Sequence, residues 1–280
     1  MIEAFLVQEV VTRALAEDLR QGDCTTDALF PDAIDADAAV IAKEPLVVTG
    51  MDLFRVVFHT LDPTLHLEII RSDGQWAQQG EAIARLRGNG RTILKGERTG
   101  LNFLQHLSGI ATLTRRFVER IQPSSAKIVD TRKTTPGLRI FEKEAVRLGG
   151  GGNHRHHLGD LILIKDNHIA LAGGVGKAIA RVRSDPPHTL KVEVEVKRLD
   201  EVKEALSAGV DIIMLDNMSP VEIETAVALI RRTNPSILIE VSGGVDLEGL
   251  TSIAQKGVDI ISVGALTHSA SAANISLNII

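Results

Sequence analysis

The second half of the chain alternates between two kinds of hydrophobic pattern. Short apolar runs rich in valine and isoleucine recur along it, and between them lie amphipathic stretches of helical period, such as 198–208 and 220–232. Ser219 followed by Pro220 is typical of a helix start, with an N-cap residue before a proline in the first turn. Repeated strand–helix units predict a parallel sheet, and their spacing favours an α/β barrel over a sandwich. The expected strands lie at 126–130, 161–164, 190–196, 211–215, 237–241 and 259–263.

The first half of the chain lacks this alternation. Its pattern predicts a helix, two separate strands, a hairpin where Asn89-Gly90 favours positive φ angles, and then a long helical region. We therefore expect an N-terminal α+β domain over 1–110 and a barrel over 111–268, with the tail at about 269–280 packing with the first domain. The expected elements are a helix at 1–18, strands at 38–42 and 65–70, a hairpin around 88–90, and a helix from about 92 to 121 that is interrupted near Gly109.

The composition is that of a folded globular protein. Hydrophobic residues make up 44% of the 280 residues and charged residues 24%, which is close to ordinary usage. The length fits one large barrel or a barrel plus a smaller unit. The net charge of −5, with seven Phe, one Trp and no Tyr, argues against a nucleic-acid surface, which needs basic residues and aromatic stacking platforms.

Cysteine usage and the start of the sequence suggest a location. Cys24 is the only cysteine, so there is no intrachain disulfide and no cysteine metal cluster, and a reducing compartment fits. The start lacks a basic region before an apolar stretch, and no run of about 18 uncharged apolar residues occurs. We expect a cytoplasmic protein that does not insert into a membrane.

Polar residues and glycines follow the predicted strands. In α/β barrels the active site lies at the carboxyl ends of the strands. One polar strand end would carry little weight, because polar residues normally close strands, but polar ends on all the predicted strands indicate a site. The segments that follow the strands are Asp130–Thr135, Lys165–His168, Glu195, Asp216–Asn217, Ser242–Gly244 and Gly264–Ala265.

Positive charge is concentrated between Lys127 and Lys165, where eight lysines and arginines stand against four acidic residues. A solvated face of the helix expected at 136–148 explains the cations within that helix. The others flank strands or glycines, and they predict a ligand with several negative groups, because arginine gives bidentate contacts to carboxylate or phosphate and lysine supplies a point charge. These cations are Arg132, Lys133, Arg155 and Lys165.

The run Val192–Val196 alternates valine and glutamate, which places the valines on one face of the strand and Glu193 and Glu195 on the other. In a barrel the valines pack outward against helices, so both glutamates face the interior, where a carboxylate needs a cation, a metal or sugar hydroxyls. For Glu193 we favour a Glu–Lys pair that merely fills the barrel. Glu195, nearer the strand end, and Asp216, at the end of the next strand, are the functional candidates.

Glycines at the last two strand ends predict a phosphate site. Backbone N–H groups in such turns approach phosphates closely, and these two positions of a barrel often bind one. They are occupied by Ser242-Gly243-Gly244 and Gly264-Ala265. The histidines that follow Gly149–Gly152 lack the ligand spacing of a catalytic zinc site. We expect this glycine hinge to deliver His154 and Arg155 to an anion instead.

Several segments together resemble the quinolinate phosphoribosyltransferase family, also called nicotinate-nucleotide pyrophosphorylase or diphosphorylase (carboxylating). The similarity extends over nearly the whole chain and is densest from 97 to 168. The resemblance implies an α+β domain of the open-faced sandwich type and an incomplete seven-stranded α/β barrel, the type II phosphoribosyltransferase fold, assembled at least as a homodimer. The motifs that carry it are Glu97–Thr99, Leu101–Gln105, Leu107–Thr112, Asp130–Thr134, Asn153–Arg155 and Lys165–His168.

The resemblance also implies a reaction. A phosphoribosyl group passes from 5-phosphoribosyl 1-pyrophosphate to quinolinate with decarboxylation, which gives nicotinate mononucleotide, CO₂ and pyrophosphate in the biosynthesis of NAD. Such an enzyme is a glycosyltransferase that acts on a pentosyl group and uses Mg²⁺.

Residue roles are implied by matching positions. The two carboxylates of quinolinate are expected to be held by Arg98, Arg132, His154 and Arg155, with Arg98 supplied by the neighbouring subunit. The expected catalytic residues are Lys133, Lys165, Glu195 and Asp216. The two lysines lie between quinolinate and pyrophosphate, and the two carboxylates bind ribose hydroxyls and Mg²⁺, either directly or through ribose or water. The further substrate-binding residues are Thr131, Ser242, Gly243, Gly244, Gly264 and Ala265, of which the last five receive phosphate.

Two other interpretations stay open. A paralogous pyrophosphorylase-like protein of molybdenum metabolism shares the barrel but departs from the family in two motifs, which are intact here at 153–155 and 165–168. A non-catalytic barrel that senses a phosphorylated metabolite would keep the glycine motifs without needing Glu195, Asp216 and the cations together. Gly100 and His106 depart from the family pattern, but outside the binding motifs.

Overall fold

A computed structural model describes residues 2–185 and 187–280, which form two compact units. The first unit consists of the chain up to Arg115 together with Thr134–Gly150 and Leu266–Ile280. The second consists of Arg116–Lys133 and Gly151–Ala265. The segment 134–150 therefore groups with the first unit by its contacts, and the domain ranges 1–110 and 111–268 stay a prediction.

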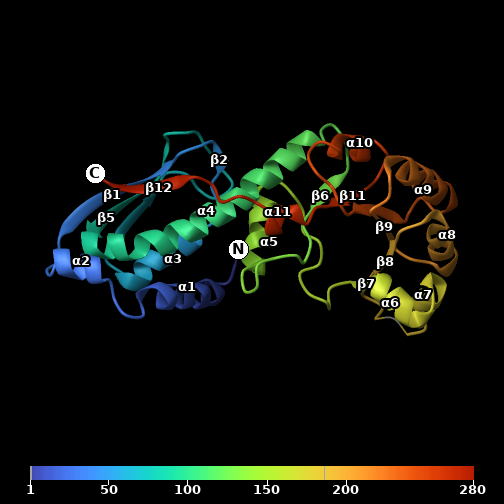
Figure 1. The fold of residues 1–280 in the computed structure, drawn as a ribbon, viewed down its shortest axis with the longest axis horizontal. Helices are drawn as coiled ribbons and strands as arrows, with labels where there is room; N and C mark the ends of the chain where they lie inside the picture. Colours follow the sequence, from blue (N-terminus) through green and yellow to red (C-terminus); the bar gives the residue numbers. More distant parts are fainter. Residues whose placement is uncertain (1, 186) are drawn as a thin grey trace. The chain divides into compact units, whose positions relative to one another are not determined.

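The first unit is built on an antiparallel sheet with the strand order β12-β1-β5-β3. Helices α3 and α4 cover one face of this sheet (Figure 1), and Phe54, Phe58, Leu101 and Leu104 on these helices are buried against its strands. The strands are β1 (Asp35–Ala42), β3 (His66–Ile69), β5 (Ala82–Asn89) and β12 (Ile275–Ile279), and a small ribbon pairs β2 (Leu46–Val47) with β4 (Trp76–Ala77). The helices are α1 (Ala4–Leu19), α2 (Cys24–Leu29), α3 (Met51–Leu61), α4 (Gly90–Arg120), α5 (Arg139–Leu148) and α11 (Ala265–His268), of which residues 266–268 group with this unit.

The expected hairpin around 88–90 is wrong. Strand β5 runs directly into helix α4, which begins at Gly90. Two hydrogen bonds explain this: the N–H of Gly90 donates to the carbonyl of Ile34 at 2.6 Å, and the side chain of Asn89 accepts from the N–H of Arg91 at 3.1 Å. The Asn-Gly pair thus supports the start of a helix and does not reverse the chain.

The expected interruption near Gly109 is also wrong, because α4 continues through this residue. A Cβ atom at position 109 would lie 2.1 Å from the carbonyl oxygen of Ser271. Glycine is present here because the segment that leads to β12 passes against the helix backbone, and any side chain would push that segment away.

The second unit contains a parallel sheet with the order β6-β11-β10-β9-β8-β7. All the strands predicted for the barrel are confirmed, and the capping box at Ser219 and Glu222 begins helix α9 as expected. The strands are β6 (Lys127–Val129), β7 (Ile162–Ile164), β8 (Val192–Val196), β9 (Ile212–Asp216), β10 (Leu238–Ser242) and β11 (Ile260–Ser262). The helices are α6 (Asp166–Ala172), α7 (Val175–Arg183), α8 (Leu199–Ala208), α9 (Pro220–Thr233) and α10 (Leu250–Ala254).

An isolated parallel bridge between Val129 and Gly152 extends this sheet beyond β6. The regular strands of this sheet are therefore six in the described residues, where the resemblance implies seven. The expected fold class, an incomplete α/β barrel with a separate α+β domain, is confirmed (Figure 1). Within the described ranges, no helix combines the length and the apolar character needed to cross a membrane.

Candidate active site

The second unit has a pocket of about 610 Å³ at the carboxyl ends of its strands. Every strand of the parallel sheet contributes to the pocket lining, through residues at its carboxyl end or just after it. The structure therefore brings together most of the residues singled out in the sequence. Those that line the pocket are Thr131, Arg132, Lys133, His154, Arg155, Lys165, Glu195, Asp216, Ser242, Gly243 and Gly244.

Three predicted residues lie elsewhere. Arg98 is exposed on α4 in the first unit. Gly264 and Ala265 follow β11 and are half-buried, but they do not line this pocket within the described part of the second unit. Their predicted roles stay predictions.

The loop after the Gly152 bridge is held by Asp130, which is fully buried at the end of β6. Its carboxylate accepts a hydrogen bond from the side-chain amide of Asn153 at 2.6 Å and another from the backbone N–H of His154 at 2.9 Å. Asp130 thereby fixes the backbone that carries His154 and Arg155, so a buried carboxyl group holds the Asn-His-Arg motif.

Arg155 and Arg132 bring two guanidinium groups to one wall of the pocket. Burial, and next the positive charge of Arg132, lower the pKa of Arg155. Arg155 donates to the carbonyl of Leu161 at 3.1 Å, which fixes the direction of its side chain. Two neighbouring cations that repel each other make a site that favours a ligand with paired negative charges.

Glu195 is the penultimate residue of β8 and Asp216 is the last residue of the neighbouring strand β9, and both side chains are mostly buried. Burial, followed by the charge of Asp216, raises the pKa of Glu195. Lysines face both carboxylates: Lys165 Nζ lies 3.6 Å from Glu195, and Lys197 Nζ lies 3.9 Å from Asp216. This arrangement suits a sugar that develops positive charge between carboxylates and cations.

The turn that follows β10 packs closely against Asn217 and requires glycine. Gly243 and Gly244 have φ angles of +90° and +60°, and a Cβ atom on Gly243 would lie 2.3 Å from the side-chain oxygen of Asn217. The N–H of Asn217 donates to the carbonyl of Ser242 at 2.9 Å, which ties the ends of β9 and β10 together. Glycine turns of this kind leave backbone N–H groups free of side-chain cover, so that an anion can approach them.

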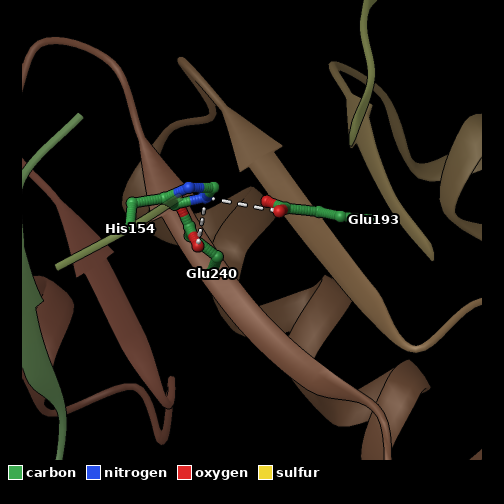
Figure 2. A group of neighbouring side chains, drawn as sticks. All are labelled: His154, Glu193 and Glu240. Atoms are coloured by element: carbon green, nitrogen blue, oxygen red, sulfur yellow. Dashed lines mark ion pairs between the residues drawn. The ribbon is translucent and has the colours of Figure 1, made fainter. Parts of the chain in front are cut away.

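Two buried glutamates face His154 beside the pocket (Figure 2), and His154 and Glu240 belong to its lining. Nε2 of His154 lies 3.3 Å from Glu193 and 3.6 Å from Glu240. The partner of Glu193 is thus a histidine, where the sequence favoured a lysine. Burial, together with the charge of Glu193, raises the pKa of Glu240 to about 7.

Glu240 was missed in the sequence. It interrupts the apolar run 237–241 and stands two positions before Ser242, so it shares the inward face of β10. The same alternation that indicated Glu193 and Glu195 was therefore present in a weaker form. Asp166 and Asn217 also line the pocket; both lie in predicted strand-end segments but were not proposed as binding residues.

Comparison with known proteins matches both parts of the chain to one family. Residues 23–108 match the model of the N-terminal domain of quinolinate phosphoribosyl transferase, and residues 110–278 match the model of its C-terminal domain. The chain belongs to the quinolinate phosphoribosyltransferase family. The resemblance inferred from the motifs is thereby confirmed.

Relatives in the quinolinate phosphoribosyltransferase family cover nearly all of the chain. The probable nicotinate-nucleotide pyrophosphorylase [carboxylating] of Synechocystis sp. is 46% identical over 251 residues, which is 90% of this chain and 85% of that protein. The corresponding protein of Bacillus subtilis is 40% identical over 273 residues, or 98% of this chain and 93% of that protein.

A solved structure of the nicotinate-nucleotide pyrophosphorylase from Francisella tularensis superposes with a TM-score of 0.94. It is 42% identical to this chain, and the alignment covers 100% of this chain and 98% of that one. This member of the quinolinate phosphoribosyltransferase family therefore has the same fold as the Francisella tularensis protein over its whole length.

Proposed function

We infer that this chain is a quinolinate phosphoribosyltransferase. It transfers the phosphoribosyl group of 5-phosphoribosyl 1-pyrophosphate to the nitrogen of quinolinate and releases pyrophosphate, CO₂ and nicotinate mononucleotide. The observation that carries this inference is a single pocket that combines arginines, paired carboxylates and a glycine turn in a chain of this family. Each of these groups suits one part of the two substrates.

The arginines of the pocket suit the dicarboxylate. Burial, and next the positive charge of Arg132, lower the pKa of Arg155, and guanidinium groups bind carboxylates in a bidentate manner. Lys133 and Lys165 supply further positive charge toward the pyrophosphate, and Thr131 lines the same wall. In our proposal these groups fix the pyridine nitrogen in line with the reacting carbon of the sugar.

The carboxylates Glu195 and Asp216 suit the ribose. As the bond between the anomeric carbon and the pyrophosphate oxygen breaks, positive charge develops on the sugar, and the two fixed negative charges stabilise it. The pyridine nitrogen then forms the new bond to that carbon. The electrons of the broken carbon–carbon bond next move into the positively charged ring, CO₂ leaves, and a proton takes its place.

The glycine turns suit the phosphate group of the phosphoribosyl donor. Ser242, Gly243 and Gly244 line the pocket with positive φ angles at both glycines, and we propose that Gly264 and Ala265 complete this phosphate site. Backbone N–H groups bind phosphate without adding a mobile charge.

Magnesium is a further part of the proposal. Oxygen donors are what Mg²⁺ prefers, and it is usually held by one or two carboxylates together with substrate phosphates, so Glu195 and Asp216 fit it. Bound there, directly or through ribose or water, Mg²⁺ would neutralise charge on the leaving pyrophosphate.

The direct test is product formation. The purified protein is incubated with quinolinate, the phosphoribosyl donor and Mg²⁺, and the products are identified by mass spectrometry. We expect nicotinate mononucleotide with release of CO₂. Binding of the donor without turnover would favour a sensor, and turnover only with another aromatic acid would favour a paralogous pyrophosphorylase.

We also propose a homodimer, or a larger homo-oligomer, in which Arg98 of one subunit reaches the pocket of its neighbour. The support is the exposed position of Arg98 on α4, together with the family motif Glu97–Thr99. A cytoplasmic location is proposed from the composition, although named plant relatives are mitochondrial or chloroplastic.

A further inference from the structure

The cluster of His154, Glu193 and Glu240 contains two carboxylates that are almost completely inaccessible to solvent. Glu193 is 0% exposed and Glu240 is 1% exposed. Within the described part of the chain, both side-chain oxygens of Glu193 and Oε1 of Glu240 have no hydrogen-bond partner. Buried carboxylates in this condition are costly unless a proton or a positive group compensates them.

The imidazole of His154 is the hydrogen-bond donor that lies beside both carboxylates. Its Nε2 points at both carboxylates, at 3.3 and 3.6 Å (Figure 2). Its other ring nitrogen, Nδ1, accepts a hydrogen bond from the backbone N–H of Arg155 at 2.7 Å. An acceptor nitrogen carries no proton, so the proton of the neutral ring stands on Nε2, between the glutamates.

A metal ion would require the opposite arrangement. Three possible ligand atoms, one from each residue, lie within 4.8 Å of one another, as they would around a cation. However, a histidine that binds a metal through Nε2 normally carries its proton on Nδ1 and donates it there. The N–H of Arg155 occupies that side of the ring, so the cluster suits a proton better than a metal.

We propose that Glu193 and Glu240 are positioning residues that hold His154 as the Nε2-protonated tautomer, so that its N–H is directed at the protein and not at the substrate. The proposal rests on the proposed function. It changes the role that the family resemblance implies for His154: recognition of the dicarboxylate falls to the arginines, and His154 positions the backbone N–H of Arg155 beside them. The raised pKa of Glu240 agrees with a shared proton at this point.

The tautomer can be observed directly in the free enzyme. Histidine side chains are labelled with ¹⁵N, two-bond ¹H–¹⁵N spectra are recorded at pH 7.5, and the signals of His154 are assigned by their loss in His154→Gln. We expect the pattern of a neutral ring protonated on Nε2. A ring protonated on Nδ1 or on both nitrogens would overturn the proposal, whether or not the enzyme turns over.

Steady-state kinetics distinguish a positioning role of the His154 ring from direct binding of the substrate by that ring. His154→Gln keeps an amide N–H near the position of Nε2 but cannot become a cation, whereas His154→Leu keeps the bulk and loses the N–H. We expect the KM for quinolinate to change less than about 3-fold in His154→Gln and to rise about 10-fold or more in His154→Leu, with a smaller change in kcat. Equal defects in both variants would mean that the imidazole itself binds substrate.

Two controls keep these results interpretable. Ile239 is fully buried on the same strand as Glu240. The variant Ile239→Val therefore measures the effect of a general disturbance of β10, and we expect it to leave the KM for quinolinate unchanged. Titration of the metal-free protein with Zn²⁺ by calorimetry should reveal no binding that depends on Glu240; stoichiometric binding lost in Glu240→Gln would overturn the proposal. Absence of nicotinate mononucleotide with wild-type protein would instead refute the proposed function and leave the tautomer result standing.

Discussion

Glu195 and Asp216 lie near the carboxyl ends of adjacent strands, and their side chains are 10% and 15% exposed. Their charges, and not their shapes, are what the proposed reaction uses. Glu195→Gln and Asp216→Asn keep the shape and remove the charge near the sugar, so kcat should fall by about 100-fold or more. The measurement is turnover of quinolinate by each variant alongside its thermal unfolding midpoint.

The midpoint serves as the control in that experiment. It should change little, because neither carboxylate has the buried network that Asp130 has. Turnover close to that of the wild type in both variants would mean that these carboxylates only fill the barrel.

Substrate choice is decided by the same small group of residues. Nicotinate lacks the 2-carboxylate of quinolinate, so it would leave part of the positive charge at Arg132 and Arg155 uncompensated. We expect its kcat/KM to be lower than that of quinolinate by about 1,000-fold or more. Competition between the two acids, followed by quantifying both products, measures the ratio, and comparable efficiencies would contradict the assigned substrate.

Glu240 gives the stability of the protein a defined pH dependence. Its pKa in the folded protein is about 7, against 4.5 ordinarily, so the folded state keeps a proton that the unfolded state releases. This contribution is fully present below about pH 4.5 and is lost as the pH rises toward 7. Because 1 pKa unit corresponds to about 1.4 kcal/mol, the loss amounts to up to about 3 kcal/mol.

Chemical denaturation of the wild type and of Glu240→Gln at pH 5 and pH 7.5 measures this effect. Between pH 5 and pH 7.5 the wild type should lose more unfolding free energy than Glu240→Gln, because only the wild type carries the titrating carboxyl group. Parallel pH profiles would show that Glu240 does not titrate in this range.

At the scale of elements, helix α4 and the segment leading to β12 are fitted to each other at Gly109. Gly109→Ala would place a methyl group 2.1 Å from the carbonyl oxygen of Ser271, and this segment would have to move. We expect a loss of about 2–3 kcal/mol in unfolding free energy. Gly176→Ala on α7 is the matched control, since its nearest neighbour would be an ordinary 3.7 Å away, and its stability should be unchanged or slightly higher.

The barrel strands could be predicted because their apolar runs are distinct and each is closed by polar residues. The two wrong predictions, at Asn89-Gly90 and at Gly109, concern positions where residues distant in the sequence make the deciding contact. Asn89-Gly90 satisfies the local rule for a hairpin, and the hydrogen bond from Gly90 to Ile34 overrides that rule. Gly109 satisfies the local rule for a helix break, and the approach of Ser271 explains the glycine instead.

The candidate site shows the same division. Lys165, Glu195 and Asp216 could be found because strand ends meet at one rim of a parallel sheet. The pairing of His154 with Glu193 and Glu240 could not, because these residues come from three separate segments and only the tertiary fold brings them within 4 Å. Arg98 carries no local signal, and only the family motif identified it.

At the scale of the whole molecule, Arg98 belongs to the first unit and the pocket belongs to the second. If the site is shared between subunits, Arg98→Ala and Lys165→Ala chains should each be nearly inactive alone. Mixed and allowed to exchange, they should form heterodimers with one intact site each. Random pairing makes half of the dimers mixed, so roughly a quarter of wild-type activity should return.

Native mass spectrometry confirms that exchange has occurred in that experiment. Two arginine variants, Arg98→Ala and Arg98→Lys, mixed in the same way provide the control, because every site then lacks the arginine and no activity should return. Exchange without recovery in the main experiment would place Arg98 within its own site or outside the reaction.

Strand β12 pairs with β1, and the whole second unit lies between them in the sequence. On the ribosome, therefore, β1 emerges long before its neighbour has been made. At a synthesis rate of roughly 5–20 residues per second the delay is on the order of 10 s or longer. Throughout this time the nascent chain displays a row of open backbone N–H and C=O groups, which any other strand can pair with. Adjacent ribosomes on one messenger RNA hold identical open edges close together, so the growing polypeptide has its greatest need of chaperones before its release.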